Sequence, residues 1–149
     1  MSVLVDSGVI YAQTDRDASR NGTATTALRT ILEGEYGQPY VTDYIYDETV
    51  TLTLARTGDH DEATRVGRRL RGAASFPELL RITHITESVF ERAVDVFEKF
   101  DDQGLSFTDA TSVAFIRTND IDTLLSFDDD FDGLVDRTAP EKLGPEHNP

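Results

Sequence analysis

The sequence predicts an α/β protein, in which helices pack against a central sheet. Two stretches carry this prediction. Near the N-terminus, the short apolar run Val3–Val5 stops at an acid, Asp6, and turns at once into a helix-like segment. Near the C-terminus, a helix pattern leads through a polar turn to the strand pattern Ile121–Phe127, which again ends in acids. Because ligands of α/β sheets gather at the carboxyl ends of strands, both ends are candidate parts of one site.

The segments between these stretches show the apolar spacing of helices in some places and that of strands in others. The apolar spacing predicts helices over 24–32, 45–56, 57–72 and 87–100, and short strands over 40–42 and 79–85. The polar stretch 13–23 is expected to be a loop. From Arg137 onward the chain carries three prolines. We therefore expect one domain, residues 1–136, followed by an irregular polar tail, residues 137–149.

Composition narrows the class of protein. A chain of 149 residues is long enough for one domain with a real core. Its 28 acidic and 14 basic residues give a formal charge of −14, and its only lysines are Lys99 and Lys142. This resembles proteins of salt-loving archaea, whose self-repulsion is screened by concentrated salt. The absence of cysteine excludes disulfides and thiolate metal sites, and no apolar run has membrane-spanning length. We expect a cytoplasmic protein without membrane contact.

Four acidic residues are the candidate site. Asp6 follows the first strand, and Asp128 follows the last apolar strand. Glu48 interrupts the apolar stripe of the helix at 45–56. Asp109 stands at the third position of a helix that Ser106 can cap, an S-x-x-D pattern. Several carboxylates brought together repel one another, so they must raise their pKa values or bind cations.

Two of these acids also have ordinary structural interpretations. Asp6 is equally compatible with a plain helix N-cap. Glu48 faces the core if its helix packs through Ile45. A carboxylate in that position would be a functional candidate, because its burial is costly unless it is paired, protonated or bound to a metal. If Val50 and Leu54 form the core face instead, Glu48 is solvated.

The only basic cluster of this acidic chain lies in the segment 57–72 and consists of Arg65, Arg68, Arg69 and Arg71. Arg65, Arg68 and Arg69 are candidates for phosphate contacts with a nucleic acid. The alternative is a solvated helix face. His60 and His84 are the only histidines before the C-terminal tail, far from the acids in sequence, so we interpret both as structural and expect neither a histidine triad nor a zinc site.

In chain order, the four acids resemble those of the PIN domain family and, within it, of the VapC-type toxins. The resemblance covers residues 3 to about 135 and is carried by VLVDSGVIYA near the start and TDATSVAFIRTNDIDTLLSFDDDF near the end. Glu48, within YDETVTLTL, matches the second acid of the family. Ser126 stands where the family often has threonine. Of the DDD run, Asp128 matches the fourth acid best and Asp130 second.

The resemblance implies a three-layer α/β/α fold with a central parallel sheet and cleavage of RNA that depends on Mg²⁺ or Mn²⁺. It also implies a homodimer and an antitoxin protein that silences the enzyme. Hard divalent ions take oxygen ligands, which agrees with an all-carboxylate site. The expected catalytic residues are Asp6, Glu48, Asp109 and Asp128, with Asp6, Asp109 and Asp128 as metal ligands and Ser7, Ser126 and Asp130 as supporting residues.

Other classes fit less well or stay open. A receiver domain needs a paired acid near its start and a late lysine, and neither is present. A DxD phosphatase needs an acid where Gly8 stands. A PIN-fold nuclease of RNA processing or turnover without an antitoxin, and a non-catalytic RNA-binding member of the fold, both remain alternatives.

Overall fold

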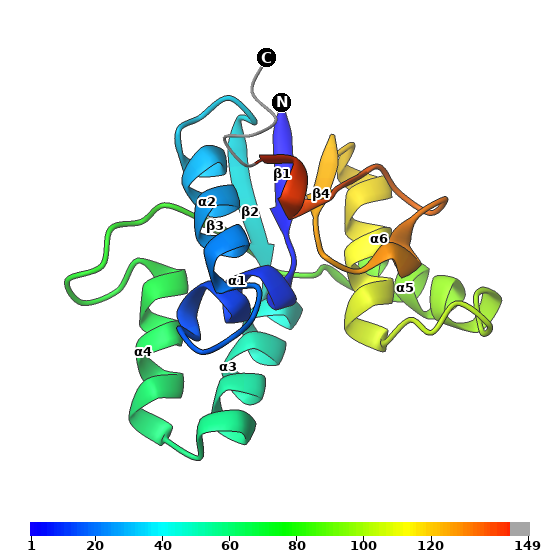
Figure 1. The fold of residues 1–149 in the computed structure, drawn as a ribbon. Helices are drawn as coiled ribbons and strands as arrows, with labels where there is room; N and C mark the ends of the chain where they lie inside the picture. Colours follow the sequence, from blue (N-terminus) through cyan, green and yellow to red (C-terminus); the bar gives the residue numbers. More distant parts are fainter. Residues whose placement is uncertain (144–149) are drawn as a thin grey trace.

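The computed structural model describes residues 1–143, which form three layers around a parallel sheet (Figure 1). Every strand pairing is parallel, in the spatial order β3-β2-β1-β4-β5. The strands are β1 (Ser2–Val5), β2 (Gln38–Thr42), β3 (Arg81–Thr83), β4 (Thr123–Leu125) and β5 (Arg137–Thr138). The predicted three-layer α/β/α fold with a central parallel sheet is confirmed.

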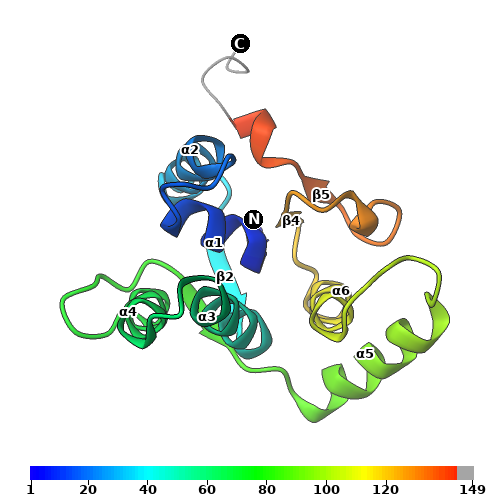
Figure 2. The same cartoon turned by 60° about the horizontal axis from the view of Figure 1, so that its bottom comes forward.

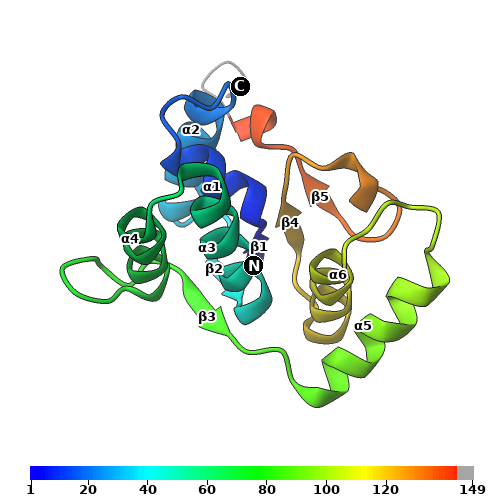
Figure 3. The same ribbon diagram turned by 90° about the horizontal axis from the view of Figure 1, so that it is seen from below.

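Within residues 1–143, six α-helices cover the two faces of the sheet. One group lies on one side and consists of α1 (Ser7–Thr14), α2 (Asn21–Leu32), α3 (Asp43–Thr57) and α4 (His60–Arg71). The other side carries α5 (Glu87–Lys99) and α6 (Phe107–Asn119), as Figures 2 and 3 show. Right-handed crossovers explain this division, because the chain reverses its direction across the sheet after β3. None of the helices within residues 1–143 has the length and apolar composition needed to span a bilayer.

The two central strands are buried on both faces. Val3, Leu4 and Val5 of β1 and Leu124 and Leu125 of β4 are all inaccessible to solvent. Strands of a covered parallel sheet are apolar throughout instead of alternating, which is the pattern seen in the sequence. Each of these side chains contributes roughly 1.5–3 kcal/mol through burial. The centre of the sheet is therefore a rigid platform for whatever follows these strands.

The carboxyl ends of β1 and β4 lie side by side. The Asp6 amide donates to the Leu125 carbonyl at 3.0 Å, which extends the ladder one residue beyond β1. From β1 the chain proceeds to β2 on one side, while β4 pairs with β1 on the other. Such a reversal of strand order leaves a crevice at the carboxyl edge of the sheet, where α/β proteins bind ligands.

Helix α3 faces the core through a stripe that the apolar pattern did not reveal. Its buried residues are Ile45, Thr49 and Thr53, whereas Leu54 is exposed. The Thr49 and Thr53 hydroxyls donate to the carbonyls of Ile45 and Thr49 at 2.7 and 2.8 Å, so both are satisfied inside the protein. Glu48 is half-buried beside this stripe, and the Val50/Leu54 alternative is wrong.

The expected irregular tail is ordered in its first part, which corrects the prediction for residues 137–143. Residues 137–138 form β5, and 140–143 form a short 3₁₀ helix against α2. Arg137 explains the docking, since it pairs with Asp132 at 2.8 Å and donates to the Ser126 carbonyl at 2.9 Å. The rest of the predicted tail, 144–149, lies outside the described residues.

Candidate active site

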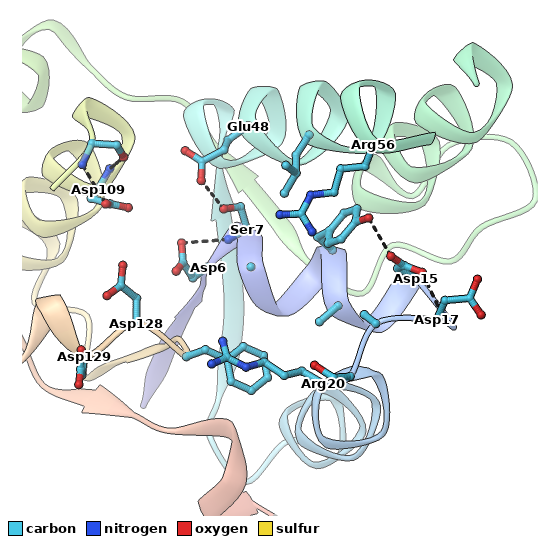
Figure 4. A pocket seen from close by; sticks show the side chains of 18 residues that line it. Asp6, Ser7, Asp15, Asp17, Arg20, Glu48, Arg56, Asp109, Asp128 and Asp129 are labelled. Atoms are coloured by element: carbon cyan, nitrogen blue, oxygen red, sulfur yellow. Dashed lines mark hydrogen bonds between the residues drawn. The ribbon is translucent and has the colours of Figure 1, made fainter. Parts of the chain in front are cut away.

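A cleft of about 1140 Å³ opens at the carboxyl edge of the sheet (Figure 4). Its walls come from α1, from α3, from the start of α6 and from the loop after β4. All four predicted catalytic acids line this cleft, although they are far apart in sequence: Asp6, Glu48, Asp109 and Asp128. Asp6 is 7% exposed, and the other three are half-buried.

Asp6 is both a helix cap and a member of this cluster, so its two interpretations are compatible. One carboxylate oxygen accepts from the Ser7 amide at 2.9 Å and caps α1. The other accepts from the Ser126 hydroxyl at 2.7 Å. Burial raises the pKa of Asp6 to about 7, with the negative charges of Asp109 and Glu48 adding to the rise and the Ser126 hydrogen bond opposing it.

Ser7 connects Asp6 to Glu48. Its amide donates to Asp6, and its hydroxyl donates to Glu48 Oε1 at 2.5 Å. Ser7 is buried in the first turn of α1, so this bridge orients the Glu48 carboxylate across the gap between α1 and α3.

Ser126 connects Asp6 to Asp128 in a similar way. Its hydroxyl donates to Asp6 and accepts from the Asp128 amide at 3.0 Å. Ser126 is fully buried directly after β4. A hydroxyl is what both contacts require, so serine meets the requirement where the family often has threonine. The two predicted supporting serines thus each join a pair of the acids.

Asp109 is fixed by a capping box at the start of α6. Its amide donates to the Ser106 hydroxyl at 3.1 Å, and its carboxylate accepts from the Ser106 amide at 3.0 Å. Burial raises the pKa of Asp109, and the charges of Glu48 and Asp128 add to that effect against the Ser106 hydrogen bonds. The capping contact holds the side chain in one orientation at the mouth of the cleft.

Asp128, and not Asp130, lies among the residues that line the cleft. Asp128 accepts from the Asp130 amide at 2.9 Å, and its charge raises the pKa of Asp130. Within residues 1–143, Asp128, Asp129 and Asp130 form the one group of three potential ligands whose oxygens lie within 4.8 Å of one another. The four predicted acids surround a wider space.

The donor set fits a hard divalent cation. The chain has no cysteine, and among the described residues no histidine lines the cleft. Mg²⁺ is usually held by one or two carboxylates together with several waters, so widely spaced acids are compatible with it. Burial is the main cause of the raised pKa values of Asp6 and Asp109, and the neighbouring carboxylates add to it; a bound cation would favour the charged form of both groups.

Several residues that line the cleft were not predicted as site residues, among them Tyr11, Arg20, Arg56 and Phe127. Only Arg56 had a signal, because it stands two turns after Glu48 and shares its helix face. The predicted RNA-binding arginines lie on α4 and do not line this cleft. One of them, Arg69, is half-buried and donates to the Gln13 side chain.

Comparison with known proteins agrees with this geometry. The model of the PIN domain family matches residues 3–135. The 23S rRNA-specific endonuclease VapC20 of Mycobacterium tuberculosis is 26% identical over 129 residues, which are 87% of this chain and 91% of that protein. A VapC ribonuclease of Archaeoglobus fulgidus is 26% identical over 113 residues, which are 75% and 68% of the two chains.

Solved structures show the same fold. The crystal structure of VapC20, described as a sarcin–ricin loop cleaving toxin, superposes with a TM-score of 0.73 at 27% identity, over 87% of this chain and 92% of that one. A toxin–antitoxin complex from Klebsiella pneumoniae gives a TM-score of 0.62 at 16% identity, over 93% and 97% of the chains. Since the family model spans nearly the whole described chain, with the four acids at one cleft, this protein belongs to the PIN domain family.

Proposed function

We propose that this protein is a divalent-metal-dependent endoribonuclease that hydrolyses phosphodiester bonds of RNA. The observation that carries the proposal is the convergence of Asp6, Glu48, Asp109 and Asp128 from four separate elements on one cleft. Two curated relatives, at 26% identity, are named as a 23S rRNA endonuclease and a ribonuclease. Asp6, Asp109 and Asp128 are the proposed metal ligands, directly or through water, and Mg²⁺ or Mn²⁺ is the proposed ion.

Hydrolysis of a phosphodiester bond requires few groups besides these four acids and the metal ion. A divalent cation held by Asp6, Asp109 and Asp128 would lower the pKa of a bound water and would stabilise negative charge on the leaving oxygen. In this proposal Glu48, whose carboxylate accepts from the Ser7 hydroxyl, orients the attacking water and accepts its proton. In the reaction a bond forms between the water oxygen and phosphorus, the bond from phosphorus to the leaving oxygen breaks, and that oxygen takes up a proton. The Ser126 hydroxyl, which contacts both the Asp6 carboxylate and the Asp128 amide, fixes the position of these two acids relative to each other.

We further propose that the protein is the toxin of a toxin–antitoxin pair, acting as a homodimer in the cytoplasm. A cleft that seven acids and two arginines of the described chain line suits inhibition by an arginine of an antitoxin, because a guanidinium makes charge-assisted bonds to carboxylates. A small gene beside this one that encodes such a partner would support the toxin. Without it, an enzyme of RNA processing or turnover is the better description.

Cleavage of RNA by the purified chain is the test. The substrates are a sarcin–ricin loop oligonucleotide and an unrelated hairpin, each with Mg²⁺, with Mn²⁺ or with a chelator. We expect internal cuts with either ion and none with the chelator. Metal-dependent binding without any cut product would favour the non-catalytic alternative, and cleavage that persists in the chelator would refute the metal mechanism.

A further inference from the structure

The cleft extends beyond the four acids, along α1. This extension is bounded by α3 on one side and by the loop between α1 and α2 on the other (Figure 4). Among residues 1–143, seven acidic residues line the whole cleft, and the only basic residues in its lining are Arg20 and Arg56. The two arginines lie on opposite sides of α1, Arg20 on the side of the Asp128 loop and Arg56 on the side of α3.

Arg20 reaches the cleft from the position just before α2. Its guanidinium carbon lies 4.6 Å from the centroid of the Phe127 ring. Phe127 stands between Ser126 and Asp128, so the stacking places a positive group next to the loop that supplies an acid of the site. An arginine stacked in this way keeps its N–H edges free for other partners.

Arg56 reaches the cleft from the opposite wall, two turns beyond Glu48 on α3. Its guanidinium carbon lies 4.9 Å from the centroid of the Tyr11 ring. Tyr11 is itself fixed, because it is 7% exposed and its hydroxyl donates to Asp15 at 2.8 Å. The ring is therefore a firm support that limits where the guanidinium can move.

Neither arginine is neutralised by a salt bridge. The ion pairs found within residues 1–143 join Asp122 to the N-terminus and Arg137 to Asp132, so Arg20 and Arg56 have no carboxylate within 4.0 Å in that part of the chain. Both are exposed side chains on a protein with a net charge of −14. The charge of Arg56 helps to lower the pKa of Asp15, but neither guanidinium is held in an ion pair within the described chain, so both are suited to an anion that enters the cleft.

We propose that Arg20 and Arg56 form a two-point clamp for the RNA backbone, each binding a different phosphate that flanks the scissile bond. This inference rests on the proposed ribonuclease function and adds the path of the RNA strand through the cleft. A guanidinium matches a phosphate bidentately, and its stacked plane is already oriented. The clamp offsets the repulsion that the acids would exert on a polyanion, while the metal site acts on the scissile phosphate.

The α4 arginines are a separate proposal. Arg65, Arg68 and Arg69 lie outside the cleft, and a contact there would add affinity without fixing the strand at the metal site. The two ideas predict different results. Losing the clamp should weaken binding and also misplace the scissile phosphate, whereas losing the α4 contacts should weaken binding alone.

The experiment measures binding of single-stranded RNA over a salt series, with Asp109→Asn as the common background to prevent cleavage. Arg20→Gln, Arg56→Gln and the double variant are compared with Arg92→Gln, which removes the same charge from the exposed face of α5. The slope of log K against log salt should flatten by about 0.7 for each clamp arginine and by about 1.4 for both. The Arg92→Gln slope should equal that of the background.

Two further measurements separate a phosphate contact from a general charge effect. Arg56→Lys should keep the salt slope, since it keeps the charge, but bind more weakly because the planar fork is lost. A single neutral methylphosphonate linkage, moved along the RNA, should abolish the effect of Arg20→Gln at one position and of Arg56→Gln at another. In the cleaving protein with Asp109 intact, the double variant should also cut more slowly when RNA is saturating.

Unchanged slopes in the double variant would overturn the clamp, even if the wild-type chain cleaves RNA. Equal slope changes in Arg92→Gln would overturn it too, because they would show a general charge effect. Failure of the wild-type chain to cleave RNA, together with failure of the Asp109→Asn chain to bind it, would overturn the ribonuclease proposal along with the clamp.

Discussion

Asp6→Asn removes a negative charge that the fold buries between Ser126 and Ser7. The pKa of Asp6 is about 7 in the folded protein, against an ordinary value of 3.8. At 1.36 kcal/mol per pKa unit, this rise corresponds to about 4 kcal/mol of stability lost when the buried group ionises. The asparagine avoids that cost, although its amide replaces an oxygen that accepts from Ser126, which adds a constant penalty of about 1–3 kcal/mol.

The sign of the pH dependence follows from proton counting. Below about pH 4, the Asp6 carboxyl is protonated in both the folded and the unfolded chain, so it contributes nothing. Between about pH 4 and pH 7 the folded protein holds a proton that the unfolded chain has released, so the free energy of unfolding falls as pH rises. Above about pH 7, Asp6 is ionised in both states and the free energy of unfolding shows no further decrease from this group.

Urea unfolding at a series of pH values from 4 to 8, in constant salt and chelator, measures this effect. The free energy of unfolding of Asp6→Asn relative to wild type should rise by about 4 kcal/mol across the range, whatever the constant offset. Added Mg²⁺ should then stabilise the wild type more than the variant, since it binds the folded site. Parallel pH curves for the two proteins would refute the burial argument, and equal Mg²⁺ increments would refute Asp6 as a ligand.

Ser126→Ala deletes the hydroxyl that lowers the pKa of Asp6, so the acid limb of the pH–rate profile should move to higher pH and single-turnover cleavage should fall about tenfold or more. Ser112→Ala is its control, because the buried Ser112 hydroxyl has no partner within residues 1–143, and it should cleave normally. The double variant Arg65→Gln/Arg68→Gln should flatten the slope of log K against log salt for RNA binding by up to about 1.4 and leave the turnover of bound RNA unchanged. Binding equal to that of the wild type would show that the arginines of α4 face solvent and do not contact RNA. Light scattering should give twice the 16.6 kDa chain mass, and co-expression with a small neighbouring gene product should give a complex that no longer cleaves. A monomer that ignores every neighbouring product would contradict both partner proposals.

The strand ends were predictable because their physics is local. A fully apolar run that stops at an acid predicts a covered parallel strand with its carboxyl end at a site, and Val3–Val5 followed by Asp6 behaves in this way. Likewise, Ser106 and Asp109 three residues apart predict a capping box, which the structure confirms. These signals depend only on neighbours in sequence.

The rest of the site depends on contacts between distant segments. Glu48 was ambiguous because the buried face of α3 carries Thr49 and Thr53, whose hydroxyls are satisfied by the helix itself and look polar in sequence. Arg20 reaches the cleft only through its stacking on Phe127, more than a hundred residues away. No local pattern reports such a contact.

The tail illustrates a third limit. Strand β5 has two residues, Arg137 and Thr138, and neither is apolar. It is held by polar contacts, including the bond of 2.7 Å between the Thr123 and Thr138 hydroxyls and the ion pair of Arg137 with Asp132. A strand stabilised in this way has no hydrophobic periodicity, so sequence patterning could not distinguish it from a loop.

Single-turnover cleavage of RNA by Asp109→Asn, in saturating Mg²⁺, tests the central claim most directly. Asparagine keeps the oxygen that accepts from the Ser106 amide, so α6 should stay capped while the charge at the cleft is lost. Asp61→Asn is the matched control, since Asp61 also lies in the first turn of a helix but outside the cleft. We predict that Asp109→Asn folds, binds RNA at least as well as wild type and cleaves slower by orders of magnitude, while Asp61→Asn is unaffected. Cleavage by Asp109→Asn at the wild-type rate would contradict the metal-nuclease account.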